Sequence, residues 1–292
     1  MQMHTPFCFL TTLLAVAASA SAQSTVSAAN NFAYGANAGW LDFRPSAADG
    51  VVVGGAFLSG HIYAANCGWI DLGDGTPANG HTYSNASAGD FGVNHDGTGT
   101  LSGYGYGANI GWIDFGWAGA NDPNRAHFDL GSGQWLGYAY SANLGWINLG
   151  TGILTTTTVA YPDSDHDGIA DAWEIQHFGN LSTAGIGTDQ DGDGQTDAAE
   201  YAADTDPNKV EEFLRIVSQN YNPGLTKVAL QFSTTRPTRS YTLQTSTTLG
   251  TGDWTPTGAS FLADPGTETT TLVTFVSGPR RFFRVAAQPP LP

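Results

Sequence analysis

The chain has 292 residues, and its 26 Asp and Glu residues outnumber its 10 Lys and Arg residues, so that the formal net charge is −16. A chain this acidic repels phosphate groups, which excludes nucleic acid as a partner. Residues 161–212 carry 14 of the acids and a single base, Lys209. This middle segment needs cations to fold compactly, because it has many like charges and few apolar residues.

Residues 1–22 have the pattern of a secretory signal. Residues 7–18 form an apolar run, and Ala20, Ser21 and Ala22 form an A-x-A cleavage site before Gln23. The run is too short to span a bilayer and no later stretch is long enough, so we expect no transmembrane segment. We therefore expect residues 23–292 to be secreted and extracellular.

Residues 23–160 are predicted to form a repetitive aromatic β domain, because an aromatic motif occurs four times between residues 30 and 150. The copies are Tyr34-Gly-Ala-Asn37-Ala-Gly39-Trp40-Leu41-Asp42-Phe43, Tyr63-Ala-Ala-Asn66-Cys67-Gly68-Trp69-Ile70-Asp71-Leu72, Tyr106-Gly-Ala-Asn109-Ile110-Gly111-Trp112-Ile113-Asp114-Phe115 and Tyr140-Ser-Ala-Asn143-Leu144-Gly145-Trp146-Ile147-Asn148-Leu149. Asn and Gly tolerate positive φ, so each Asn-x-Gly predicts a tight hairpin turn. The Trp residues are 29, 43 and 34 positions apart. This uneven spacing disfavours a strict solenoid and favours a closed or sandwiched β-sheet.

Strand alternation assigns the two faces of each copy. Positions 41/43, 70/72, 113/115 and 147/149 are all apolar, so this face is the predicted core. The opposite face carries the candidate ligand-binding residues Trp40, Trp69, Trp112, Trp146, Asp42, Asp71, Asp114 and Asn148. Two interpretations stay open. The rings and oxygens form a sugar-binding surface, or each Trp packs on a neighbouring repeat while each Asp ends its strand.

Cys67 is the lone cysteine of the expected mature chain, since Cys8 lies in the signal segment. No disulfide is therefore expected. Its counterparts in the other three copies are Ala38, Ile110 and Leu144. They predict that Cys67 is a small apolar filler rather than a reactive thiol.

Residues 161–210 hold the same twelve-residue acidic loop twice. Carboxylates fall at positions 1, 3, 5, 9 and 12 of each loop, with Gly at position 6. Ca²⁺ takes about six to eight oxygens in flexible geometry, and this spacing lets alternate side chains converge on one ion together with the carbonyl at position 7. The expected ligands are Asp163, Asp165, Asp167, Ile169, Asp171 and Glu174 in the first loop, and Asp189, Asp191, Asp193, Gln195, Asp197 and Glu200 in the second. The predicted cofactor is calcium, about two ions.

A short helical run follows each loop, and turn-like residues precede it, which predicts half EF-hands. Trp173, Ile175, Phe178 and Tyr201 are expected to form the apolar contact between the two halves. Because the loop motif Asp-x-Asp-x-Asp-Gly-x-x-Asp-x-x-Glu is followed some residues later by Thr205-Asp206-Pro207, the segment resembles the bacterial thrombospondin type 3-like calcium repeats. The resemblance implies an extracellular, calcium-stiffened connector between modules, outside or on the surface of a bacterial cell.

Dockerins share this loop and this loop-helix layout, and they imply the same calcium ligands. They have Ser or Thr at loop positions 10 and 11 for docking to cohesin. This chain has Ala172-Trp173 and Ala198-Ala199 there.

Residues 211–287 contain about six or seven β-favouring runs, separated by turns such as Asn222-Pro-Gly, which predicts a fibronectin-like β-sandwich. Residues 288–292 are a predicted tail. The expected fold class is therefore mainly β: a repetitive β-hairpin domain, a short loop-helix connector that binds calcium, and a C-terminal β-sandwich.

The sequence contains no HExxH motif, no G-x-S-x-G motif and no phosphate loop. Glycoside hydrolysis needs two carboxylates in different environments, whereas Asp42, Asp71 and Asp114 are equivalent copies, so a carbohydrate-active enzyme is disfavoured. Two non-enzymatic functions remain beyond calcium binding. One is a glycan-binding or adhesive component of the surface or matrix, with a polysaccharide or a matrix protein as partner. The other is a purely structural protein–protein module, used for dockerin-like docking or as a matrix scaffold.

Overall fold

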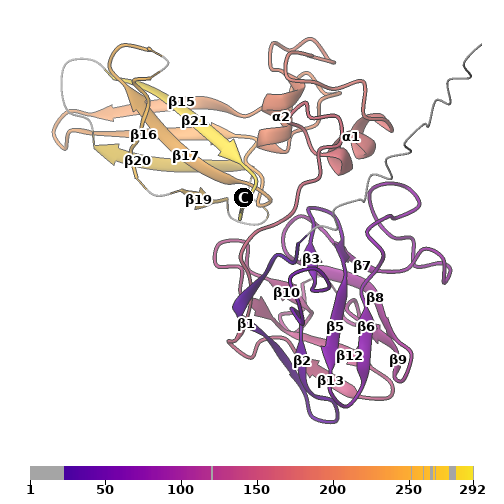
Figure 1. Cartoon of the computed structure of the whole chain (residues 1–292). Coiled ribbons are helices and arrows are strands. Elements are labelled where there is room, and N and C mark those ends of the chain that lie inside the picture. The colour runs from indigo at the N-terminus through magenta and orange to yellow at the C-terminus, as the bar shows by residue number, and fades with distance from the viewer. Residues whose placement is uncertain are drawn as a thin grey trace, which may run out of the picture.

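Figure 1 shows the computed structural model of the chain, which describes residues 23–119, 121–250, 252–258, 260–263, 266, 268–275 and 281–291. The expected signal segment, residues 1–22, lies outside the described residues. The described part is mainly β, as predicted, with two short helices between two β regions.

The first β region is a closed antiparallel barrel built from four hairpins. Its strands are β1 (Val26–Gly35), β2 (Gly39–Asp42), β5 (His61–Ala64), β6 (Gly68–Asp71), β8 (Leu101–Gly107), β9 (Gly111–Asp114), β12 (Tyr138–Ser141) and β13 (Gly145–Asn148). They pair in the order β13-β12-β9-β8-β6-β5-β2-β1, and β13 also pairs with β1. Of the two architectures that the sequence left open, the structure has the closed one. Closure gives each of the eight barrel strands a neighbour on both sides, so the ring has no open sheet edge.

Short strands lie in the segments that connect the hairpins and in the segment after the fourth hairpin, at the end of the barrel opposite the Asn-x-Gly turns. They are β3 (Val52–Val53), β4 (Leu58–Ser59), β7 (Val93–His95), β10 (His127–Phe128), β11 (Trp135–Leu136) and β14 (Leu154–Thr156). We call this the loop end of the barrel, and it is the end that faces the helices in Figure 1.

Asn and Gly have different roles in the hairpin turns. Gly39, Gly68, Gly111 and Gly145 have φ between 72° and 80°, so Gly takes the left-handed position. Each Asn instead donates its side-chain Nδ2 to a carbonyl of the preceding copy, and the first copy bonds to the fourth. The four bonds are Asn37 to Leu144 (3.0 Å), Asn66 to Ala38 (3.1 Å), Asn109 to Cys67 (3.0 Å) and Asn143 to Ile110 (2.8 Å). This asparagine ring ties the four turns together at the turn end of the barrel.

The barrel core includes every residue that alternation placed inside. All eight predicted positions, Leu41, Phe43, Ile70, Leu72, Ile113, Phe115, Ile147 and Leu149, are at most 2% exposed. Cys67 is buried in the same core beside the turn and is a free cysteine. Burial raises the pKa of the Cys67 thiol, which disfavours the reactive thiolate.

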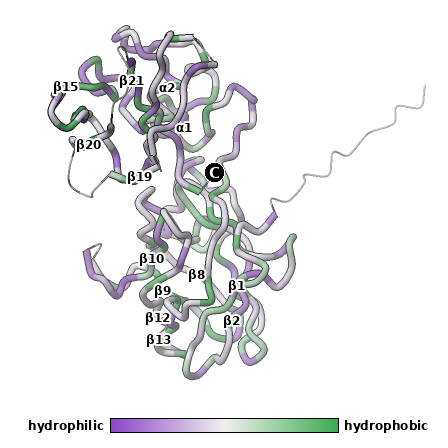
Figure 2. The backbone as a smooth tube through the Cα atoms, turned by 90° about the vertical axis from the view of Figure 1, so that its left-hand side faces the viewer, coloured by the Kyte–Doolittle hydropathy of each residue, from purple (hydrophilic) through white to green (hydrophobic). Residues whose placement is uncertain are grey.

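The C-terminal region is a two-sheet β-sandwich. One sheet contains β15 (Arg215–Asn222), β16 (Lys227–Ser233) and β20 (Thr269–Phe275), and the other contains β17 (Ser240–Ser246), β18 (Thr255–Pro256), β19 (Phe261–Leu262) and β21 (Phe282–Gln288). Val228, Leu230 and Phe232 of β16 pack with Leu243 of β17 between the sheets. The side view in Figure 2 separates the barrel from the part that holds the helices and the sandwich, and the C-terminus lies between them.

Replacing Asn109 by Ala should lower the free energy of barrel unfolding by about 1–2 kcal/mol, because it removes one ring bond and leaves the Cys67 carbonyl without its donor. Denaturant unfolding followed by tryptophan fluorescence measures the change. Asn30→Ala, at an exposed position of β1, is the control and should have little effect. Equal stability of the two variants would contradict a stabilising ring.

Candidate functional site

Two acidic loops lie between the barrel and the sandwich, each followed by a helix. The helices are α1 (Asp171–Phe178) and α2 (Asp197–Ala203), and each begins at position 9 of its loop. Both helices end at a residue in the left-handed conformation, Gly179 and Asp204. This loop-helix arrangement is the half EF-hand that the sequence predicted.

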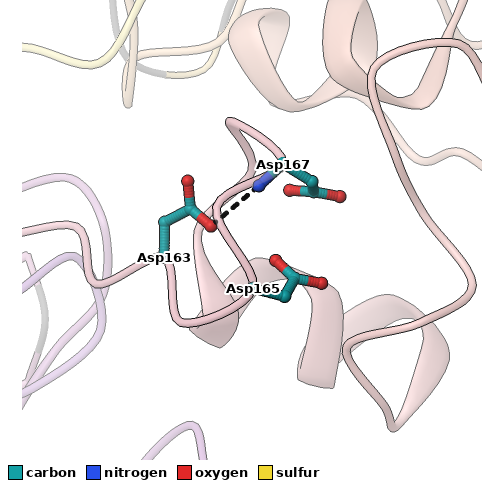
Figure 3. Close-up of side chains that lie close together, drawn as sticks. All are labelled: Asp163, Asp165 and Asp167. Carbon is teal, nitrogen blue, oxygen red and sulfur yellow. Dashed lines mark hydrogen bonds between the residues drawn. The ribbon is translucent and has the colours of Figure 1, made fainter.

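The side chains at positions 1, 3 and 5 converge in both loops. One carboxylate oxygen from each of Asp163, Asp165 and Asp167 lies within 4.8 Å of the others, and Asp189, Asp191 and Asp193 form the same group in the second loop. Figure 3 shows the first group around the curve of its loop. Three carboxylates this close repel one another unless a cation lies between them.

Backbone N–H groups that donate to loop carboxylates hold each loop in this curve, and several of these bonds recur in both copies. Asp163 Oδ2 accepts the N–H of Gly168 at 3.0 Å, and Asp189 Oδ2 accepts that of Gly194 at 3.1 Å. These bonds join position 1 to position 6. The loop is therefore shaped by its own side chains. Oδ2 of Asp167, Asp191 and Asp193 has no hydrogen-bond partner among the described residues, so these oxygens remain for a ligand.

The position-12 glutamates are the strongest indication that these loops bind a cation. Glu174 is 0% exposed and Glu200 is 1% exposed. Neither carboxylate has a hydrogen-bond partner for either oxygen among the described residues. Burial, with the neighbouring aspartates, raises the pKa of Glu174 to about 7 and that of Glu200 to about 8. A buried carboxylate without a partner is costly, and a bound cation would satisfy it.

The remaining predicted ligands have additional roles. At position 9, Asp171 Oδ1 accepts the Ser164 N–H at 2.7 Å, and Asp197 Oδ1 accepts the Gln190 N–H at 3.0 Å. Neither belongs to the converging groups, so these side chains brace the loops, and calcium loops often reach this position through a water. At position 7, the N–H groups of Ile169 and Gln195 are fixed by Asp167 and Asp193.

A small apolar core joins the two halves. It contains Ile169, Trp173 and Ala184, with Phe178 and Tyr201 packed against it. The expectation that Ile175 belongs to this core was wrong. Ile175 turns to the barrel instead and lies against Gly80, because that face of α1 covers a barrel loop.

The oxygen-only donor sets fit calcium, which prefers carboxylate and carbonyl oxygens in a flexible cage. They define a calcium-binding module of the extracellular type. The family model of the bacterial TSP3 repeat matches residues 189–210, which span the second loop, α2 and Thr205-Asp206-Pro207. The match confirms the resemblance to thrombospondin type 3-like calcium repeats. No curated protein and no solved structure matches the chain.

Among the residues that the structure describes, no helix is long and apolar enough to cross a membrane.

The outer face of the barrel carries an aromatic belt of four Tyr–Trp pairs, one in each hairpin. The pairs are Tyr34–Trp40, Tyr63–Trp69, Tyr106–Trp112 and Tyr140–Trp146, with ring centroids 4.8–5.1 Å apart. The four Trp side chains are 45–53% exposed. The ring contacts of Trp40 and Trp69 are with residues of their own hairpins, while Trp112 and Trp146 also contact the loop residues Phe91 and Trp117. Each Tyr–Trp pair lies next to the turn of its hairpin, so the belt goes around the barrel near its turn end.

Polar oxygens alternate with the rings of this belt. Each strand-ending Asp or Asn lies directly opposite the Tyr of the next hairpin, in the pairs Asp42–Tyr63, Asp71–Tyr106, Asp114–Tyr140 and Asn148–Tyr34. Oδ1 of each aspartate accepts the N–H of the residue two positions later, which is the strand-ending role. A carboxylate has about four acceptor sites, so this bond leaves capacity for a ligand.

Sequence reasoning missed the asparagine ring and the residues that fasten the connector. Asn at the same position of all four copies was a signal for the ring, since a turn alone does not require Asn in every copy. His81 and Arg239, which bond to the connector backbone, belong to no motif.

Calcium affinity should fall by about tenfold for each pH unit below about pH 7 at the first loop and below about pH 8 at the second, because a proton on Glu174 or Glu200 must leave before the ion binds. Without calcium, the stability of the connector depends on pH in the opposite direction. The raised pKa values stabilise the folded connector at low pH, and this stability is lost as the pH rises through about 7–8. Calorimetric titration at about pH 8 and about pH 6 measures the affinity. An affinity that is the same at both pH values would contradict the burial of these carboxylates.

Exchanging the residues at loop position 4 should change the stability of the two loops in opposite directions. His166 has φ 65° and Gly192, at the same position of the second loop, has φ 77°. His166→Gly should therefore stabilise the calcium-bound first loop by about 0.5–1 kcal/mol, and Gly192→His should destabilise the second by a similar amount. Thermal unfolding in calcium measures both. Destabilisation by His166→Gly would show that the imidazole contributes more than the strain.

Proposed function

We propose that this is a secreted, non-catalytic, calcium-binding protein of the bacterial cell exterior, whose barrel binds polysaccharide through the aromatic belt. The observation that carries the proposal is the alternation of half-exposed Trp–Tyr pairs with Asp and Asn side chains around the barrel. A Trp ring stacks on the apolar face of a pyranose, and the neighbouring oxygens accept hydrogen bonds from its hydroxyls. The repetition of the carboxylates supports binding over catalysis, because an acid and a base need different environments.

The closed barrel determines how such a surface meets its ligand. Its four Tyr–Trp pairs face different directions around one axis, so a single flat chain meets one or two of them. The belt would then link several polysaccharide chains, each weakly, and gain strength from multiple contacts. This arrangement favours an adhesive or matrix role.

The belt lies near the turn end of the barrel, whereas α1, which follows the first calcium loop, contacts the loop end. Gly39, for example, belongs to a turn and directly precedes Trp40, while Gly80 of the loop end touches Ile175 of α1. Calcium removal therefore leaves the belt intact in this proposal, and the ions serve to orient the sandwich and the barrel.

Trp112→Ala combined with Trp146→Ala should reduce retention of the purified chain on insoluble polysaccharides at least about tenfold, because aromatic stacking contributes roughly 1–3 kcal/mol at an exposed site. A pull-down on a panel of polymers, with calcium and with chelator, measures retention. The matched control is Trp254→Ala, which removes a partly buried Trp of the sandwich.

Saturable retention that is lost in the double variant and kept in the control supports glycan binding. No retention of the parent chain on any polymer would overturn it. Recovery of protein neighbours by cross-linking would then favour the protein–protein scaffold.

A further inference from the structure

We propose that the two calcium loops control different joints: the first loop fastens the connector to the barrel, and the second fastens it to the sandwich. The inference rests on calcium binding by the loops and does not depend on glycan binding. It assigns to each ion a separate mechanical role.

The barrel joint is formed by α1. His81, in the barrel loop between β6 and β7, places Nδ1 3.0 Å from the carbonyl oxygen of Ala172, to which the ring N–H donates. Ile175, three residues further along the same helix face, lies so close to Gly80 that a Cβ there would be 3.3 Å from its Cγ2. Both contacts flank Glu174, the buried position-12 residue of the first loop.

The sandwich joint is formed by the end of α2. Arg239, immediately before β17, is 6% exposed, and its Nη2 donates to the Tyr201 carbonyl at 3.0 Å and to Asp204 Oδ1 at 3.3 Å. The hydroxyl of Thr238 also donates to the Asp204 carboxylate. Tyr201 directly follows Glu200, the buried position-12 residue of the second loop. A buried guanidinium whose acceptors moved away would be costly, so this joint depends on the geometry of α2.

The ions are needed because neither helix can form this geometry alone. α1 has 8 residues and α2 has 7, well below the length at which an isolated helix is stable. The glutamate in the first turn of each is buried without a partner among the described residues. An ion that binds this glutamate pins the first turn to its loop. The Ala172 and Tyr201 carbonyls are then held where His81 and Arg239 need them.

Other contacts limit how far a joint can open. The Val159 N–H donates to the Leu291 carbonyl at 2.8 Å, and Leu291 packs against the barrel core, so the C-terminal tail joins sandwich to barrel without an ion. Trp173 and Tyr201, with ring centroids 5.6 Å apart, connect the two halves. Loss of one ion should therefore loosen its own joint locally rather than separate the domains.

Hydrogen exchange measured by mass spectrometry on the purified chain in calcium tests the assignment. Glu174→Gln should speed exchange at least about tenfold in residues 171–178 and around His81, with little change around Arg239. Glu200→Gln should do the same in residues 197–205 and around Arg239, with little change around His81. Glu211→Gln is the charge-matched control, since Glu211 is exposed and outside both loops.

Barrel and sandwich core strands, which should stay protected, report that each variant is folded. If either loop variant loosened both joints equally, the loops would act as one unit and the proposal would fail. If neither joint responded, the ions would not control them, and the proposal would also fail.

Linkage supplies a second, independent test. If the second ion stabilises the sandwich joint, the joint must strengthen binding of that ion by the same factor. Arg239→Gln should therefore weaken calcium binding at the second loop about fivefold and leave the first loop unchanged. Calorimetric titration in the Glu174→Gln and Glu200→Gln backgrounds isolates each loop. An unchanged affinity at the second loop, or equal weakening at both, would overturn the assignment.

Discussion

Repulsion among the clustered carboxylates is the constraint on which the middle of this molecule depends. Three aspartate oxygens converge within 4.8 Å in each loop, and a buried glutamate follows on the helix side. A divalent cation converts this repulsion into attraction. Because the two helices are too short to be stable alone, the shape of the connector follows from the ions. The surfaces that meet the barrel and the sandwich follow from that shape.

The barrel differs from the connector, because neutral groups rather than charges stabilise it. Four side-chain amides bond around the turn end, and a large cluster of buried apolar side chains, the eight predicted positions among them, fills the inside. Each Asn bonds to the preceding copy, so the ring is complete only when the first copy meets the fourth. The first and fourth copies are joined twice. The backbone joins them through the pairing of β1 with β13, and the side chains through the bond from Asn37 to Leu144.

The sequence predicted whatever depends on local periodicity and missed whatever depends on contacts between distant segments. Alternation assigned all eight core positions, and carboxylate spacing located both loops. Closure of the barrel could not be deduced, because pairing between hairpins crosses connections of unequal length. Ile175 was misassigned for a related reason: a helix pattern shows that a residue faces an apolar neighbour, but not which one. The contacts of His81 and Arg239 likewise depend on how the modules pack together.

The calcium loops lie in the part of the molecule where the burial of apolar side chains is insufficient to stabilise the fold. The barrel and the sandwich each have their own hydrophobic core, whereas the connector core has only Ile169, Trp173 and Ala184 as buried members. So small a core cannot offset the conformational entropy lost when some 50 residues are ordered. Ion coordination supplies the missing free energy, and even a site with a Kd of about 10⁻⁴–10⁻³ M is occupied at extracellular calcium concentrations. The acidic middle segment is thus suited to a compartment where calcium is abundant, and there the ions order a segment that burial alone leaves unstable.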